Sequence, residues 1–333
     1  MTLAAEAPDL DIFSAFGGPA FGFGHHRGFT HSFLGSFLVS GLVVGFMYLI
    51  WRSGLVARLK SLVSLVLGRK TQYDLQPQWG RLYALAYLAC VSHILLDFTN
   101  NYGVRPFWPF WEKWYSWDIV FIIEPLLLVL LLGGLLLPGL FSLINNEIGA
   151  RSKGLRGRGA ATAALIGVCI TWGVRDYEHR RAVNVLDARL YRDAEPLRVS
   201  AFPAMGNPFQ WYGVVETANF FATMPVDSLA PDVDPQGQMQ IRPKPEETPV
   251  TLAAKRSYLG RVYLDWGQYP FTETDKTPSG GYIVRFRDLR FENSSFRGRN
   301  PLGAGVELDS NLNVAREFVG TRSRLVEDKA AKP

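Results

Sequence analysis

Long runs without charged residues, all in the first half of the chain, constrain this sequence more than any other feature. Residues 32–51 and 125–146 carry no charged side chain, and between Arg81 and Asp97 only His93 can titrate. About 20 apolar residues cross the hydrocarbon core of a bilayer, so these runs match or approach the length of a spanning helix. The sequence therefore predicts a membrane domain, although the average composition, 48% hydrophobic and 20% charged, is that of a soluble protein.

The second half of the chain is polar, and short alternating stretches in it predict strands at 211–218 and 282–291. The predicted fold class is a multi-span α-helical membrane domain followed by a smaller α+β extramembrane domain. In chain order we expect a Gly- and Phe-rich loop over 1–31, a membrane domain over 32–175 with spans at about 32–51, 82–98, 119–144 and 160–174, the α+β domain over 176–322, and a disordered tail over 323–333.

Several local expectations accompany this division. Thr30 is the predicted N-cap of the first span. Pro125 and Pro138 predict kinks in the third span. The remaining expectations are an interfacial amphipathic helix over 55–67, a charged helix leaving the membrane over 175–192, a Pro-rich linker over 230–249 and a helix over 250–266.

The net charge of +5 reflects membrane topology better than nucleic-acid binding, which we do not expect because no recognisable nucleic-acid module is present. Lys and Arg number six in 52–81 and four in 145–159, against two in 99–118 and one in 1–31. The positive-inside rule places the first two segments in the cytoplasm and the last two outside, and four spans then place the C-terminal domain outside as well. Five arginines within 175–192 oppose this orientation.

Cysteine usage and the N-terminus exclude other classes of protein. Cys90 and Cys169 lie inside apolar segments, so neither a disulfide framework nor a zinc finger is predicted. The first residues lack a basic n-region and are interrupted by acidic residues at 6, 9 and 11, so they do not resemble a signal peptide.

A histidine and a carboxylate lie four residues apart inside the second predicted span, at His93 and Asp97. An ionisable side chain in a spanning helix costs roughly 2.5 to 3.5 kcal/mol, so it usually marks a functional site and needs a partner. Residues four apart share one face of a helix, so both side chains can reach one ion or each other. In a soluble protein a simple hydrogen-bonded pair is the commoner explanation, whereas beside a bilayer we favour a metal site.

Topology brings further candidate ligands to the same membrane face, because the start of the first span, the end of the second and the start of the third share a side. His26 and His31, with Gly28 between them, fit a loop that enters a helix. Imidazole and carboxylate ligands suit zinc, manganese or iron, and we expect zinc first. The predicted metal ligands are Asp9, Asp11, His26, His31, His93 and Asp97, enough for one ion or two.

A catalytic metal site keeps a position open for water and lowers the pKa of that water toward neutrality. Asp118, expected on the same membrane face, is the predicted general base, or alternatively orients a histidine ligand. Arg27 suits a phosphate or carboxylate of the substrate. Asn100 and Asn101 are placed to orient that substrate.

The order of these motifs resembles the bacterial inner-membrane family of membrane-bound metal-dependent hydrolases. The likeness covers about residues 7–130 and is weaker for the C-terminal region, around 207–211. Its motifs are Pro8-Asp9-Leu10-Asp11, His26-Arg27-Gly28-Phe29-Thr30-His31-Ser32, Ser92-His93-x-x-x-Asp97, Asn101-Tyr102-Gly103, Trp117-Asp118 and Glu124-Pro125. The resemblance implies metal-assisted hydrolysis, with Asn101 and Tyr102 as substrate-binding residues.

The resemblance has one departure. Members of that family usually begin with another apolar helix that bears a Thr-His pair, whereas this chain starts almost at Pro8-Asp9. We therefore expect either a further segment upstream or a member that lacks one ligand and one span.

The predicted function is that of a multi-pass inner-membrane hydrolase with its metal site and C-terminal domain outside the cytoplasm. Metal-activated water would attack an ester or phosphoester, with a lipid-derived substrate as one option and the lipid bilayer as the partner. The alternative is a non-enzymatic membrane scaffold or transport component in which His93 and Asp97 form a structural or proton-relay pair. Transporters usually place polar groups near the midplane and have related halves, and neither feature is visible in this sequence.

Overall fold

The computed structural model describes residues 1–55, 58, 76–147, 157–230, 233–234, 237–292 and 302–320. These residues form two compact units. The first unit contains Met1–Phe98 and Gly103–Ser116, and the second contains Thr99–Tyr102 and Trp117–Pro333. The predicted interfacial helix over 55–67 falls almost entirely outside the described residues, as does the predicted tail from 323.

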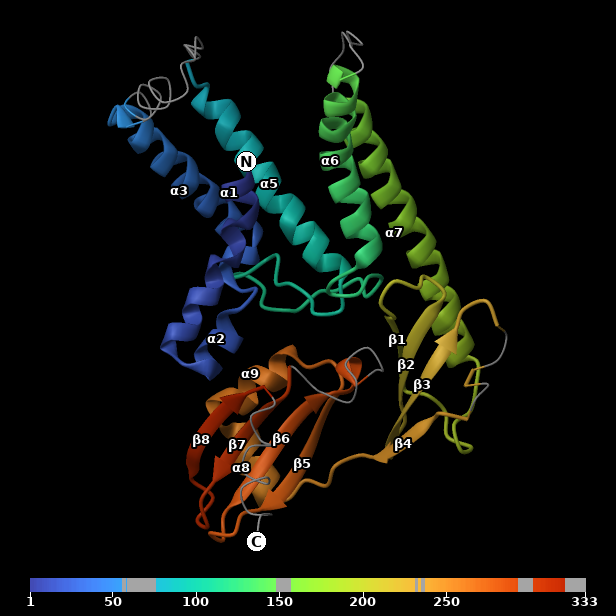
Figure 1. Cartoon of the computed structure of the whole chain (residues 1–333). Helices are drawn as coiled ribbons and strands as arrows, with labels where there is room; N and C mark the ends of the chain where they lie inside the picture. Colours follow the sequence, from blue (N-terminus) through green and yellow to red (C-terminus); the bar gives the residue numbers. More distant parts are fainter. Residues whose placement is uncertain are drawn as a thin grey trace, which may run out of the picture. The chain divides into compact units, whose positions relative to one another are not determined.

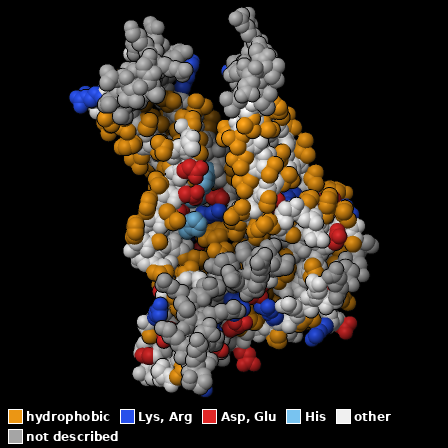
Figure 2. Space-filling model, in the orientation of Figure 1, with side chains coloured by type: hydrophobic (Ala, Val, Ile, Leu, Met, Phe, Trp, Pro, Cys, Tyr) orange, Lys and Arg blue, Asp and Glu red, His pale blue; other side chains and the backbone are white. Residues whose placement is uncertain are grey.

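Two long apolar helices dominate the first unit: α3 (Phe33–Arg52) and α5 (Trp79–Thr99) (Figure 1). They contain 20 and 21 residues with mean hydropathies of 2.1 and 1.5, long and apolar enough to cross a membrane. At 1.5 Å per residue each is about 30 Å long, which matches the hydrocarbon core of a bilayer. They correspond to the first two predicted spans, and Figure 2 shows hydrophobic side chains over the outward surfaces of the helices.

Small and polar side chains join α3 and α5 to the N-terminal helix α1 (Thr2–Glu6). The Ser40 hydroxyl donates to Cys90 Sγ at 3.2 Å, and the Cys90 thiol donates to the carbonyl oxygen of Ala4 at 2.9 Å. Nearer the start of α5, the Tyr83 hydroxyl donates to the Phe37 carbonyl oxygen at 3.1 Å. Because each polar group finds a partner inside the unit, these contacts are compatible with an apolar surrounding.

The predicted loop over 1–31 is wrong, because this segment folds into short helices. After α1 come the 3-10 helix η1 (Ala7–Gly17), the helix α2 (Pro19–His25) and the 3-10 helix η2 (Phe29–His31). Gly18 (φ +109°) and Gly28 separate these helices, so these two glycines mark breaks between helices and not one continuous loop. The N-cap of α3 is Ser32, whose hydroxyl accepts from the Gly35 amide at 2.9 Å, and not the predicted Thr30.

The first two helices of the second unit are an antiparallel pair, α6 (Pro125–Glu147) and α7 (Arg158–Asp187) (Figure 1). The third predicted span was expected to start at 119, but α6 starts at Pro125. A proline at the first position of a helix costs no backbone hydrogen bond, so Pro125 does not introduce the predicted kink. The fourth was expected to end at 174, but α7 is 30 residues long and continues to Asp187. Among the residues of α6 whose side chains the structure describes, Pro125–Phe141 form an apolar helix.

The rest of the second unit is an α/β region with two antiparallel four-stranded sheets. The charged end of α7 packs on the first sheet, where Leu186 and Ala182 join a buried core with Trp211 and Met224. The first sheet has the order β1 (Arg198–Pro203), β2 (Gln210–Glu216), β3 (Phe220–Asp227), β4 (Gln240–Pro243), and the second the order β5 (Pro270–Lys276), β6 (Tyr282–Asp288), β7 (Ala304–Leu308), β8 (Val314–Val319).

Helices α8 (Pro249–Arg256) and α9 (Tyr258–Trp266) pack on the second sheet, and η3 (Leu289–Phe291) follows β6. The strands predicted at 211–218 and 282–291 are confirmed as β2 and β6, but these end earlier, at Glu216 and Asp288, and the predicted residues 289–291 form η3. The predicted helix over 250–266 is divided at Ser257, whose hydroxyl accepts from Gly260 N and caps α9. The predicted linker over 230–249 is wrong in part, because it contains β4.

Candidate metal centre

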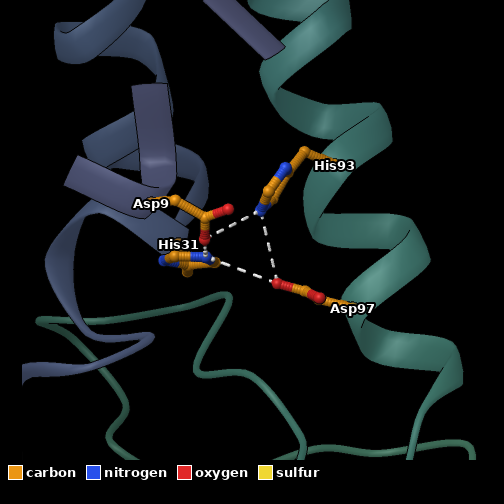
Figure 3. Close-up of side chains that lie close together, drawn as sticks. All are labelled: Asp9, His31, His93 and Asp97. Carbon is orange, nitrogen blue, oxygen red and sulfur yellow. Dashed lines mark ion pairs between the residues drawn. The ribbon is translucent and has the colours of Figure 1, made fainter. Parts of the chain in front are cut away.

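Four side chains of the first unit converge on one point: Asp9 from η1, His31 from η2, and His93 and Asp97 from α5 (Figure 3). His31 Nε2 lies 3.4 Å from Asp9 Oδ1 and 3.3 Å from Asp97 Oδ2. His93 Nε2 lies 3.4 Å from each of the same two oxygens. All four atoms are within 4.8 Å of one another, so they form a possible metal-binding group.

These distances fit a divalent ion held by nitrogen and oxygen ligands. Zinc bonds of 2.0 to 2.2 Å place neighbouring tetrahedral ligands about 3.3 to 3.6 Å apart, the range of the four separations here. Within the described residues, Nε2 of His31 and of His93 is buried and makes no hydrogen bond of normal geometry. A buried donor or acceptor left without a hydrogen bond is costly, so the donor set is better matched to an ion than to mutual hydrogen bonding.

A second layer of contacts fixes the direction of His31. Its Nδ1 lies 3.1 Å from Asp11 Oδ2 and 3.2 Å from the Thr30 hydroxyl. With a carboxylate beside Nδ1, the proton of the neutral ring belongs on that nitrogen, and Nε2 presents its lone pair to the centre. Asp11 Oδ1 also lies 3.1 Å from His26 Nδ1, so Asp11 and His26 stand behind His31 and not among the four converging ligands.

Arg27 fixes the other side of the centre. Its guanidinium donates to Asp97 Oδ1 at 2.6 Å and to the Gly103 carbonyl oxygen at 3.3 Å, which leaves Asp97 Oδ2 facing the histidines. The backbone amide of Arg27 donates to Asp11 Oδ2 at 2.6 Å, with Arg27 in the left-handed region at φ +52°. The side chain is 10% exposed, and Arg27 contacts two carboxylates, Asp97 through its guanidinium and Asp11 through its backbone amide; its role toward a substrate remains a prediction.

The charges around His31 act on one another strongly. The imidazoles of His31 and His93, each with Nε2 3.4 Å from Asp9 Oδ1, lower the pKa of Asp9 well below its usual range. Burial alone would raise the pKa of Asp11, but hydrogen bonds from His26 and His31 lower it. Burial alone would lower the pKa of His31, but Asp11, Asp9 and Asp97 raise it to about 10. The three carboxylates therefore favour positive charge beside them, whether it is a proton on a histidine or a bound cation.

The tight turn between η2 and α3 positions His31 in the four-residue cluster. Gly35 at the start of α3 lies so close to the preceding η2 turn that a Cβ there would be 1.7 Å from the Phe29 carbonyl oxygen. The Ser32 hydroxyl donates to that same oxygen at 2.8 Å and accepts from Gly35 N. His31 is fully buried by this arrangement, whereas the Asp9 side chain is 51% exposed. The centre therefore opens to its surroundings at Asp9.

The other predicted site residues belong to the second unit. Asn101 is fully buried and its carbonyl oxygen accepts from Arg290 Nη1 at 2.8 Å. The Tyr102 carbonyl oxygen accepts from Trp266 Nε1 at 3.1 Å, and Asp118 has a φ of +58°. Their roles as substrate contacts and general base remain predictions. Sequence reasoning missed the contact of Thr30 with His31, for which the signal was a hydroxyl directly before a ligand histidine.

Comparison with known proteins places this architecture in a family. The family described as YdjM inner membrane protein matches residues 1–181, which include the whole four-residue cluster. The chain belongs to the YdjM inner membrane protein family. That membership supports a location in the inner membrane, together with the two apolar helices α3 and α5.

The C-terminal part matches a second family, the YfhP C-terminal alpha/beta plait domain, over residues 249–330. The chain is also similar over its length to the uncharacterized protein YfhP of Bacillus subtilis (strain 168), with 25% identity over 327 residues that cover 96% of this chain and 84% of that protein. No solved structure matches. The relative thus shares both parts of the chain, and its name states no activity.

Proposed function

We propose that this protein is a membrane-bound metal-dependent hydrolase that acts on an ester or phosphoester. The observation that carries the proposal is the convergence of two imidazole nitrogens and two carboxylate oxygens at separations of 3.3 to 3.4 Å. Such a mixed nitrogen and oxygen donor set suits zinc, with manganese or iron as alternatives.

In this proposal some residues bind the ion directly and others orient the side chains that bind it. His31, His93, Asp97 and Asp9 hold it, while Asp11 and Arg27 keep His31 and Asp97 in position. A bound divalent ion supplies Lewis acidity and a water acidified toward neutral pH. Asp9 is the half-exposed ligand, so we place substrate entry on its side. Asp118 as general base, and Asn101 and Tyr102 as substrate contacts, complete the proposal.

We further propose that the chain crosses the membrane four times, through α3, α5, α6 and α7, with the cluster and the α/β region outside the cytoplasm. The basic segment 52–81, with six Lys and Arg residues, would then face the cytoplasm. The cluster lies at the opposite end of α3 and α5 from this segment, because His31 precedes α3 and Asp97 is near the end of α5.

Metal analysis of the protein purified in detergent tests the proposal directly. We expect one divalent ion per chain in the wild type, and loss of that ion after chelation, in His93→Ala and in Asp97→Asn. The matched control is His25→Ala, because His25 is exposed and its Nδ1 contacts the Phe21 carbonyl oxygen and not the cluster. A wild type that stays metal-free after reconstitution with zinc, manganese and iron would exclude the site.

One observation favours a second function. The Arg27 guanidinium and the histidines already balance the carboxylates, so the cluster can also serve as a structural or proton-relay network in a scaffold or transport component. That function predicts a folded, metal-free protein. His93→Ala would then alter solute movement in vesicles without changing hydrolysis of any ester.

A further inference from the structure

The segment that carries Asp9 has an unusual distribution of side chains. η1 is an 11-residue 3-10 helix, and because such a helix has three residues per turn, positions three apart line one face. The inward face contains Pro8, Asp11 and Ser14, which are buried or half-buried. The outward face contains Leu10, Phe13 and Phe16, which are 55%, 57% and 89% exposed.

The remaining face of η1 joins the ligand to this apolar surface. It carries Asp9, with its side chain 51% exposed, and Ile12, which is 67% exposed. Phe13 and Phe16 stack on each other with ring centroids 5.9 Å apart. The exposed ligand of the cluster is therefore bordered by exposed apolar side chains on its own helix.

A second segment of the same unit extends this surface around the start of α3. This segment is 106–111. The Phe33 amide donates a hydrogen bond to the Pro106 carbonyl oxygen at 2.9 Å, and the ring of Phe107 packs edge-on against the ring of Phe33 with centroids 5.7 Å apart. Phe107, Phe110 and Trp111 nevertheless remain 49%, 82% and 58% exposed. Aromatic side chains of this kind favour the interface between hydrocarbon and water.

Apolar side chains are also exposed on α3, the helix that follows His31. On α3 itself, Phe33, Leu34 and Phe37 are 40%, 38% and 49% exposed, and η1 contacts this helix. Asp97 and His93 lie two and six residues before the last residue of α5, which is about 3 and 9 Å of helix rise. Headgroup layers are roughly 5 to 8 Å thick, so an α5 that spans the hydrocarbon core places the cluster near the depth of lipid ester and phosphate groups.

We propose that η1 lies in the lipid interface through Leu10, Ile12, Phe13 and Phe16, and that the substrate is a bilayer lipid whose ester or phosphoester reaches the cluster past Asp9. This inference rests on the proposed metal site. A bilayer is favoured over a protein partner because η1, which carries these exposed side chains, contacts α3, a helix that is itself apolar and largely exposed. A water-soluble substrate would give no reason to surround the open ligand with phenylalanines.

Two measurements on the full chain in phosphatidylglycerol vesicles test the inference. In the first, Phe16→Trp adds one fluorophore to the outward face of η1, and brominated phosphatidylcholine is mixed into the vesicles as the quencher. We expect most of the added fluorescence to be quenched, and little quenching for Leu197→Trp, a control at an exposed apolar residue of the α/β region. Because quenching needs no metal, its outcome is independent of the proposed function.

In the second measurement, manganese replaces the native ion, the bound manganese is counted, and the relaxation of the lipid phosphorus is measured. We expect faster phosphorus relaxation with the wild type than with His93→Ala. Bound manganese without that effect overturns the inference and leaves the metal site standing. Absence of bound manganese overturns the metal site, and the lipid substrate with it.

The first measurement has its own contrary outcome. Equal, weak quenching at positions 16 and 197 would show that η1 is not in lipid, and would overturn the inference whatever the metal content. A change in oligomeric size of Phe13→Asp/Phe16→Asp together with absent quenching would assign the face to a second copy of the chain.

Discussion

At the scale of single residues, the site depends on the direction in which two neighbouring aspartates point. Asp9 and Asp11 are two residues apart, and in a 3-10 helix that separation turns the side chains to different faces. Asp11, with its side chain 6% exposed, points inward to His31 Nδ1, while Asp9 reaches His31 Nε2 and His93 Nε2. In the proposed site these two carboxylates of one motif therefore have different roles, Asp9 as a ligand and Asp11 as the residue that orients His31.

Asp11→Asn tests that division of tasks. The amide keeps the size of the side chain but removes the charge that holds the proton on His31 Nδ1. We expect metal affinity to fall about 10- to 100-fold, the usual effect of losing a carboxylate behind a histidine ligand. Competition with a chelator of known affinity measures this, and Glu6→Gln, at an exposed carboxylate of the same segment, is the control.

Two results would contradict the positioning role. Complete loss of metal, as expected for His93→Ala, would make Asp11 a ligand, as the sequence alone allowed. Unchanged affinity would show that Thr30, which also contacts His31 Nδ1, is sufficient to orient the ring.

At the scale of elements, the junction of η2 and α3 sets the position of His31. The Phe29 carbonyl oxygen, the Ser32 hydroxyl and Gly35 pack so closely that the turn admits no side chain at 35. Gly45, in the same helix, has open space around it. The two glycines therefore offer a matched pair of substitutions.

Gly35→Ala is expected to displace the η2 turn and, with it, His31. A Cβ at 1.7 Å from a backbone oxygen forces that backbone to move. We expect a loss of metal affinity and a lower melting temperature in detergent, whereas Gly45→Ala should leave both unchanged or slightly stabilise α3. Equal behaviour of the two variants would show that the turn does not hold the ligand.

The junction before α6 contains a second buried polar contact. Arg175 on α7 donates to Glu124 Oε2 at 2.8 Å and to the Ile119 carbonyl oxygen at 3.3 Å. The two side chains of the ion pair are 0% and 2% exposed. Such a pair fixes where α6 begins against α7, since neither charge can be left alone in this environment.

Breaking this pair from one side should cost more than removing it entirely. We expect Arg175→Met to destabilise the protein by about 3 to 5 kcal/mol, and Arg175→Met/Glu124→Gln to recover part of that loss. Thermal unfolding in detergent measures both. Arg180→Met is the control, because the Arg180 side chain is 73% exposed and an ion pair at such a position, here with Asp176, contributes below about 1 kcal/mol. A double variant no more stable than Arg175→Met would contradict the explanation.

At the scale of the whole molecule, membrane topology decides which compartment the cluster faces. Both a two-span and a four-span arrangement place residues after α7 on the same side as the cluster, because each adds an even number of crossings. The segment between α6 and α7 separates the two arrangements. It lies on the cytoplasmic side only if α6 and α7 both cross.

Reporter fusions that are active only outside the cytoplasm should follow this parity. We expect activity after Arg192 and none after Arg52, since the basic segment 52–81 favours the cytoplasm. The fusion after Glu147 should be inactive if there are four spans and active if there are two. Activity after Arg52 would reverse the whole orientation.

The sequence by itself determined that histidines and carboxylates distant along the chain meet at one end of two apolar helices. Run length and charge decide where a chain crosses a bilayer, and crossing parity then places the ends of the helices on one side. It did not reveal the 3-10 helix at 7–17, although the spacing of Leu10, Phe13 and Phe16 by three residues was a usable signal.

Only the tertiary structure decided which predicted residues converge. In the structure His26 and Asp11 lie behind His31, and Arg27 contacts Asp97. These contacts depend on side-chain direction at single turns and on the approach of segments up to 76 residues apart in the sequence. Hydrophobic periodicity carries no information about such contacts. They are set by close packing and by the need to pair each buried charge, which act only once the chain has folded.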